Sequence, residues 1–431
     1  MTSMTRVRRG RRAAFCAGFL ALCAAAAAAR AAPAEPAEPV EAAEPAEPAW
    51  TFGGFGTLSA VHSTQAQADY TASPISPGQA GFGKAWAFDV DSRLGAQLGV
   101  QLDKRWSAVV QVVQERSVAR HYEPHLEWAN VKFQATPELA LRAGRIALPL
   151  FLAADYRKAS YALPWVRPPV ELYSAMPISN SDGIDASYRW RGFGARHETQ
   201  LMVGRAAVRL SPEAAGKAKH VLGLTNNATA GALTLRVTVA QALLEVDGAA
   251  PFFDAFRAFG PVGQALADRY DIASRRVNVL GAGFNYDPGR WFLMGEVGRV
   301  NARSMLGDQS AGYLSGGYRF GTVTPYATWA RSAANMATST VGLPIADLPP
   351  ETASLAGQLN GELNRWLRSI PVQDTAGAGV RWDVAPGYAF KVQLDRVHPH
   401  AGSSGTLTNV QPGFVSGRAF RVVSAGMDFV F

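Results

Sequence analysis

Cysteine is nearly absent from this chain. Its only two cysteines among 431 residues, Cys16 and Cys23, both lie in the first 31 residues. If that segment is removed, the remaining protein can form no disulfide and no cysteine-ligated metal site. The rest of the fold must therefore be stable without covalent cross-links.

Acidic residues are also missing from the first 31 positions, which hold six arginines and so account for most of the formal net charge of +8. An uncharged apolar stretch runs from Ala13 to Ala29, and small residues flank Arg30. This order of features is typical of a secretory signal peptide, so residues 1–31 are predicted to be cleaved during export. No basic tail or helix is then left that would suit nucleic acid, which excludes that class of partner.

Large apolar residues are absent from residues 32–49 apart from Val40, and the segment consists of alanine, proline and five glutamates. Such a segment buries too little surface to offset its ordering entropy, so it is predicted to be an extended acidic tether. Beyond it, no stretch approaches the 18 or so consecutive apolar residues of a membrane helix. Only 18% of all residues are charged and 10% are aromatic, which excludes disorder for the bulk of the chain.

Residues 50–431 contain instead many short segments in which apolar and polar residues alternate. Leu94 and Leu98 fall on one face of a segment at 90–102, while Arg93 and Gln97 fall on the other. In the same way Val380 is placed on an apolar face, and its neighbour Gly379 is placed on a polar face where serine should be tolerated. Alternation with a period of two predicts β-strands with one apolar and one polar side.

Short turns and longer connections separate these segments alternately. Seven turns are short, and eight connections are longer, at residues 62–84, 115–123, 147–181, 210–218, 245–275, 301–310, 333–373 and 398–419. The pattern predicts an all-β fold, a transmembrane antiparallel β-barrel of about 16 strands with both ends on the short-turn side. A soluble β-sandwich is the alternative. In the fifth connection, phenylalanines near helical spacing predict a short packed helix, at Phe252, Phe253, Phe256 and Phe259.

The opening segment Trp50-Thr-Phe-Gly-Gly-Phe-Gly and the closing segment Gly426-Met-Asp-Phe-Val-Phe431, which ends on an aromatic residue, resemble those of Gram-negative outer-membrane porins. The resemblance covers residues 50–431. Arg142-Ala-Gly-Arg145, which leads into a long proline-rich third loop, resembles the porin constriction loop. The stretch from Asp155 to Tyr173 is similar to DcaP-like and related substrate-type porins, although the acidic tether departs from a coiled-coil amino terminus. The resemblance implies a homotrimer in contact with outer-membrane lipid and lipopolysaccharide.

The third loop, 147–181, is predicted to fold into the barrel and narrow it, because five prolines stiffen it. The predicted constriction residues are Arg145, Asp155, Arg157, Lys158, Arg167 and Glu171. Alternation places further basic residues on the lumen wall, at Arg93, Lys132, Arg236, Arg319, Arg381 and Lys391. These charges suggest weak attraction of small anions such as carboxylates. In the alternative interpretation, Arg157 pairs with Asp155 and Arg167 pairs with Glu171, so that the arginines only fix the loop.

The sequence predicts no catalytic motif. Residues 78–84 have the glycine and lysine spacing of a phosphate-binding loop, but Ala85 replaces the hydroxyl residue that would hold magnesium. The histidine pairs at 121 and 125 and at 398 and 400 are interpreted as solvated loop residues. The prediction is therefore a passive diffusion channel for small hydrophilic solutes in the bacterial outer membrane, weakly anion-selective, with no enzymatic activity, metal or cofactor. The alternative is an occluded barrel that acts as a surface receptor, adhesin or enzyme.

Overall fold

A computed structural model describes residues 48–210 and 214–431. The predicted signal peptide at 1–31 and all but the last two residues of the predicted tether at 32–49 lie outside the described residues. None of the helices within the described part of the chain combines the length and the hydropathy required to cross a bilayer.

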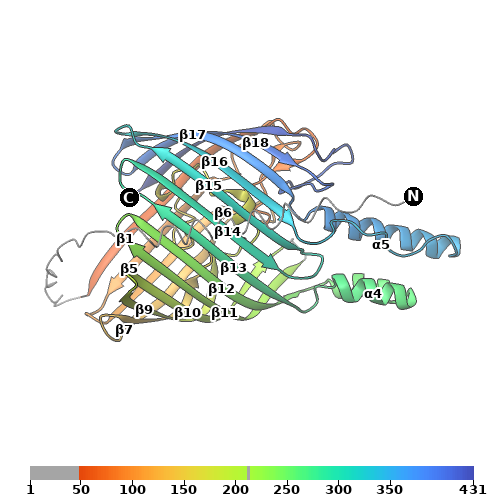
Figure 1. Ribbon diagram of the computed structural model, residues 1–431, viewed down its shortest axis with the longest axis horizontal. Coiled ribbons are helices and arrows are strands. Elements are labelled where there is room, and N and C mark those ends of the chain that lie inside the picture. The colour runs from red at the N-terminus through yellow and green to blue at the C-terminus, as the bar shows by residue number, and fades with distance from the viewer. Residues whose placement is uncertain (1–47, 211–213) are drawn as a thin grey trace. The chain divides into compact units, whose positions relative to one another are not determined.

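Sixteen long antiparallel strands form a closed barrel (Figure 1). They are β1 (Ala49–Ser63), β5 (Arg93–Gln101), β6 (Trp106–Arg116), β7 (Tyr122–Gln134), β8 (Leu139–Ala147), β9 (Asn180–Gly192), β10 (Ala195–Arg209), β11 (Ala215–Ala230), β12 (Leu233–Val246), β13 (Arg275–Tyr286), β14 (Trp291–Asn301), β15 (Asp308–Tyr318), β16 (Val323–Ala334), β17 (Gln373–Ala385), β18 (Tyr388–Pro399) and β19 (Phe420–Val430). Each long strand pairs with the next, and β1 pairs with both β5 and β19, so the sheet has no free edge among these strands. The predicted all-β barrel of sixteen strands is confirmed.

Short turns join the strands at one end of the barrel, and longer connections join them at the other, as the sequence predicts. The first connection is longer than predicted, because β5 begins only at Arg93. It contains three two-residue strands, β2 (Asp69–Tyr70), β3 (Ala80–Gly81) and β4 (Trp86–Ala87), of which β4 pairs with β1. The residues just before β5 are held by carboxylate contacts instead, since Asp89 pairs with Arg116 and Asp91 pairs with Arg167.

Successive residues of a strand point to opposite sides of the barrel wall. On β18, Lys391 and Asp395 are buried on the inside, whereas Val392 and Leu394 are 43% and 50% exposed on the outside. The same outward exposure of large apolar side chains recurs around the barrel, at Leu58, Leu94, Leu98, Val110, Ile184, Leu201, Val203, Leu222, Leu224, Val237, Val239, Leu280, Leu314 and Val380. A soluble sandwich would bury this face, so the arrangement favours the barrel over the sandwich.

The carboxyl terminus closes the barrel seam. The backbone nitrogen of Gly54 donates to the Phe431 carbonyl at 2.9 Å, and the Phe431 nitrogen donates back to the Gly54 carbonyl at 3.1 Å. Exposed aromatic side chains gather near this end, at Trp50, Phe52, Trp106, Trp291, Tyr318, Trp382, Tyr388 and Phe431. Amphipathic rings of this kind favour the boundary between an apolar layer and water.

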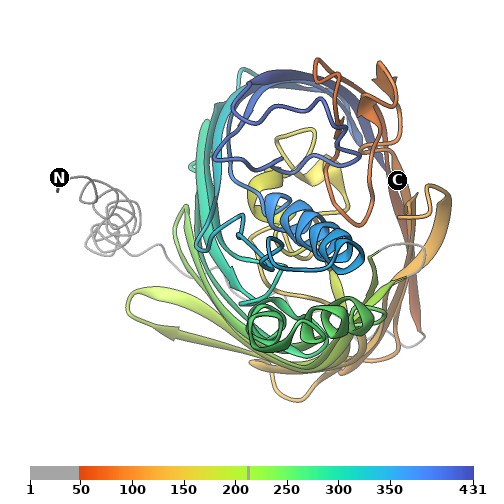
Figure 2. The ribbon, with the colours of Figure 1, turned by 90° about the vertical axis from the view of Figure 1, so that its right-hand side faces the viewer.

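Helices of eight or more residues lie in two of the long connections. α3 (Ala250–Arg257) and α4 (Gly260–Tyr270) lie between β12 and β13, and α5 (Pro350–Arg368) lies between β16 and β17 (Figures 1 and 2). Phe253 and Phe256 of α3 are buried in one apolar cluster with Leu363 and Leu367 of α5. The predicted phenylalanine helix is confirmed, whereas α5 was not predicted.

The third long connection, residues 148–179, carries the short helices η1 (Ser160–Ala162) and α2 (Val170–Tyr173). Figure 2 shows this yellow segment within the ring of strands. Its apolar residues Phe151, Trp165 and Leu172 share a buried cluster with wall residues that include Phe292 and Tyr313. The largest apolar core of the barrel thus lies between this connection, here called the third loop, and the inner face of the wall.

Candidate functional site

The start of the third loop is fixed to the wall through one carbonyl group. The Pro149 oxygen accepts hydrogen bonds from Thr225 Oγ1 at 2.9 Å, from Arg236 Nη2 at 2.7 Å and from Thr238 Oγ1 at 3.3 Å. These donors stand on β11 and β12. Arg236 lies on the inner face, where the sequence places it, but its guanidinium is buried against the loop.

On the neighbouring part of the wall, the carboxylate of Glu296 on β14 binds two segments of the third loop. It accepts from the Leu152 nitrogen at 2.7 Å and from the Tyr173 hydroxyl at 2.7 Å. The Tyr313 hydroxyl of β15 donates to it at 2.8 Å. Because Glu296 is only 3% exposed, three donors are what a buried carboxylate requires.

Two predicted wall cations on β17 and β18 also donate to loop carbonyls. Lys391 Nζ donates to the Ser160 and Trp165 oxygens at 2.6 and 2.9 Å, and it pairs with Asp428 at 2.7 Å. Arg381 Nη1 donates to the Leu163 oxygen at 2.9 Å. Both side chains lie inside the barrel as predicted, and both position the loop.

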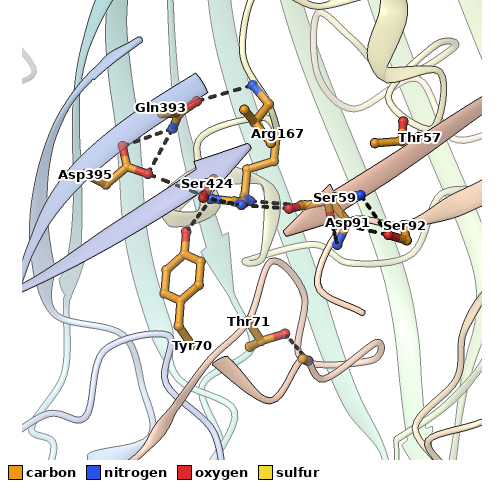
Figure 3. A network of polar contacts seen from close by, with 12 residues as sticks. Thr57, Ser59, Tyr70, Thr71, Asp91, Ser92, Arg167, Gln393, Asp395 and Ser424 are labelled. Atoms are coloured by element: carbon orange, nitrogen blue, oxygen red, sulfur yellow. Dashed lines mark hydrogen bonds and ion pairs between the residues drawn. The ribbon is translucent and has the colours of Figure 1, made fainter. Parts of the chain in front are cut away.

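Arg167 is the centre of a buried polar network between the third loop, the first loop and β19 (Figure 3). Its Nε and Nη2 donate to the two carboxylate oxygens of Asp91 at 2.9 and 2.6 Å. Nη2 also donates to Ser424 Oγ at 2.7 Å, Nη1 donates to the Tyr70 hydroxyl at 3.3 Å, and Asp395 lies 3.8 Å from Nη1. With 3% of its surface exposed, Arg167 faces protein rather than solute.

Glu171 does not pair with Arg167, which is close to it in the sequence, but binds residues of β17. Its carboxylate accepts from Gln373 Nε2 at 2.6 Å and from Thr375 Oγ1, both on β17. Burial raises the pKa of Glu171, while these two hydrogen bonds act in the opposite direction. The alternative pairing of Arg167 with Glu171 is therefore wrong, because the closed sheet supplies nearer partners from other strands.

The remaining charges of the third loop lie in its first half. Arg157 donates to the carbonyls of Met176 and Pro177 at 3.2 and 2.5 Å, so its predicted alternative pairing with Asp155 is also wrong. Lys158 pairs with Glu115 of β6. Asp155 is exposed.

The other predicted site residues lie apart from this network. Arg93 faces inward on β5, 3.9 Å from Glu115, and Lys132 faces inward on β7 opposite Arg142. Arg145 pairs with Asp182 at 2.6 Å, and both stand on the outward face in register with Ala129.

Arg319 follows the end of β15 at the short-turn end, where it pairs with Asp287 at 2.7 Å. The structure does not bring Arg145 or Arg319 against the third loop.

Sequence reasoning did not find the partners that hold Arg167, namely Tyr70, Asp395 and Ser424. A signal was available for Asp395, because the alternation of β18 places this charged side chain on the inner face of the barrel. The third loop is therefore fixed to the wall by buried charged groups. The charged side chains on the inner face of β5–β9 lie beside the loop.

No family model matches the sequence, and no curated protein matches it. Solved structures do match. The outer-membrane channel DcaP of Acinetobacter baumannii is 9% identical over 90% of this chain and 98% of that chain, with a TM-score of 0.53. An anion-selective porin from Comamonas acidovorans is 13% identical over 89% and 100%, and OmpF of Salmonella typhi in complex with daunomycin is 11% identical over 89% and 97%, each with a TM-score of 0.51. The chain therefore has the fold of the Gram-negative outer-membrane porins.

Proposed function

We propose that this protein is a bacterial outer-membrane porin through which small hydrophilic solutes diffuse passively. The observation that carries the proposal is the closed barrel with an apolar outer face and a charged inner face, within which the third loop is fixed. Such a wall suits lipid outside and water inside. Residues 1–31 would direct export and be cleaved, residues 32–49 would form the periplasmic tether, and the long loops would face the cell exterior.

The charges beside the third loop support a weak preference for anions. The inner wall of β5–β9 and the first half of the loop carry seven basic side chains, Arg93, Lys132, Arg142, Arg157, Lys158, Arg189 and Arg191, against five acidic ones, Glu115, Glu123, Glu127, Asp155 and Asp185. An excess of two positive charges biases the potential without excluding cations. A solved structure of the same fold is described as an anion-selective porin.

The partners in this proposal are two further copies of the chain in a homotrimer, together with outer-membrane lipid and lipopolysaccharide. The proposal includes no enzymatic step.

A second candidate is a surface receptor or adhesin, and one observation favours it: α3, α4 and α5 form an apolar-centred helical unit in the long loops. A receptor would not need an open lumen.

Planar-bilayer recording distinguishes these two functions. The purified protein is expected to give discrete current steps of constant size in neutral salt, because each inserted barrel adds one water-filled path. Heat-denatured protein is the control. A folded barrel that inserts without current steps would contradict the channel and favour the receptor.

Lys132 provides the test of anion preference. It faces the lumen at half-burial and takes part in no ion pair within the described residues, so Lys132→Glu changes the lumen charge by two units without leaving a partner unpaired. At separations near 10 Å in salt water, this change should lower the anion-to-cation permeability ratio on the order of twofold to threefold. The reversal potential in a salt gradient measures the ratio.

The matched control is Lys217→Glu, which makes the same charge change on the outer face. It should leave the reversal potential where it is. Equal shifts in both variants, or no shift for Lys132→Glu, would contradict the proposed role of the lumen charges.

A further inference from the structure

A cluster of arginines stands on the outer face of β16–β19, close to the long-loop end. Arg331 lies three residues before the end of β16, Arg396 three before the end of β18, and Arg421 is the second residue of β19. All three are exposed. The cluster is called the rim patch below.

The register places these residues side by side. Arg396 and Arg421 are direct cross-strand partners, and Arg331 is directly opposite Asp374 of β17. Ala376 links the rows, since it is opposite both Trp329 of β16 and Arg396. Direct partners in an antiparallel sheet have their Cβ atoms about 5 Å apart.

Two of the three arginines of the rim patch have no carboxylate partner in the part of the chain that the structure describes. Asp374 lies 3.5 Å from Arg331 and also 3.1 Å from His400. Within the described residues, neither Arg396 nor Arg421 forms an ion pair. Like charges directly opposite each other destabilise a sheet, unless an anion lies between them.

Two outward cations on β11 provide a contrast. Lys217 pairs with Asp247 at 2.8 Å, and Lys219 pairs with Glu245 at 2.7 Å. These two exposed cations have carboxylate partners within the protein, which Arg396 and Arg421 lack among the residues that the structure describes.

A cleft of about 350 Å³ opens beside the patch, lined by Trp329, Arg331, Asp374, Arg396 and His398 among others. Toward the middle of the barrel, the same outer face continues with Leu394, Val392 and Met427, which are 50%, 43% and 43% exposed. A guanidinium fork binds phosphate oxygens in pairs, and tryptophan favours the headgroup level of a bilayer. The face thus offers a phosphate site directly above an apolar surface.

We propose that the rim patch binds a phosphate group of an outer-leaflet phosphoglycolipid, with Arg396 and Arg421 as its main ligands and Arg331 beside them. The acyl chains then lie along Leu394, Val392 and Met427. This inference rests on the proposed outer-membrane location, and it assigns a place on the barrel to the lipopolysaccharide named among the proposed partners.

The test measures binding of bis-phosphorylated lipid A to the detergent-solubilised full-length protein, by titration with a fluorescently labelled lipid. Each basic residue near a lipid headgroup contributes a factor of about five, so R396Q/R421Q should bind about thirtyfold more weakly than the wild type. The matched control K217Q/K219Q removes two outward cations that already have partners and should bind like the wild type. Folding of every variant is checked by comparing the gel mobility of unheated and heated samples.

Three results would overturn the site: equal affinity of R396Q/R421Q and wild type, equal binding of lipid A that lacks both phosphates, or full competition by millimolar inorganic phosphate. If R396Q/R421Q changes the oligomeric state but not lipid affinity, the arginines contact a second copy instead, and the proposal is again wrong. Bilayer conductance of the same samples separates this inference from the function. Current steps without phosphate-dependent binding reject only the site, and binding without current steps rejects only the channel.

Discussion

Replacing Arg167 by alanine is expected to destabilise the barrel by about 3–5 kcal/mol and to detach the third loop from the wall. The guanidinium neutralises Asp91, whose side chain is fully buried, and lies 3.8 Å from Asp395, whose side chain is 5% exposed. Without the cation, two carboxylates remain in a region with little water. Movement of the loop away from the wall then lowers the free energy, because water can reach the two carboxylates.

Two measurements check this expectation. Unfolding by urea in lipid vesicles reports the loss of stability, and single-channel recording should show a larger, noisier conductance as the loop leaves the wall. Arg365→Ala is the control, because Arg365 pairs with Glu362 on the surface of α5 and its side chain is 72% exposed. Exposed pairs contribute at most about 1 kcal/mol.

Arg167→Lys separates charge from geometry. Lysine keeps the positive charge but cannot form the paired bonds to Asp91 or reach Ser424 and Tyr70 at once. It should recover part of the stability and leave the conductance between wild type and Arg167→Ala. An alanine variant with wild-type conductance and stability would show that the loop is held by its apolar contacts alone.

The architecture followed from the sequence because its signals are local. The period of two and the short turns are visible within a strand or two, and the alternation of seven short turns with eight long connections predicted the strand number and the pairing order. The phenylalanine spacing that predicts α3 is equally local. α5 carries a local signal of the same kind, since its buried residues Ala356, Leu359, Leu363 and Leu367 recur at helical spacing, but no helix was predicted there.

The site could not be predicted to the same extent, because its partners are distant in sequence. Arg167 binds Asp91, 76 residues away, and Ser424, 257 residues away, whereas the sequence suggested Glu171, four residues away. Alternation indicated which face a residue occupies, and Arg236, Arg381 and Lys391 do lie inside. Alternation gave no information on which of these cations would donate hydrogen bonds to the carbonyl groups of the loop.

Gly379 shows the same limit at a single position. Alternation places it on the inner face, and the sequence suggests that serine would be harmless there. A Cβ atom at Gly379 would lie 2.4 Å from the Tyr326 hydroxyl and 2.7 Å from the Val392 carbonyl oxygen. That expectation is wrong, because Tyr326 covers the glycine while its hydroxyl donates to Gln393 at 2.9 Å.

Val380→Arg is expected to cost about 2–4 kcal/mol, since Val380 lies near the middle of β17, is 42% exposed on the outer face and would place a charge in the bilayer core. The next residue is itself an arginine, Arg381, whose inward side chain reaches Asp383 and loop carbonyls. A shift of one position along the strand therefore decides whether a guanidinium group faces lipid or reaches partners within the protein. Urea unfolding in vesicles measures the cost, and Val380→Leu, which keeps the face apolar, should change stability by far less. If arginine and leucine were equally tolerated, Val380 would not face lipid, and the outer face of β17 would have to be covered by protein instead.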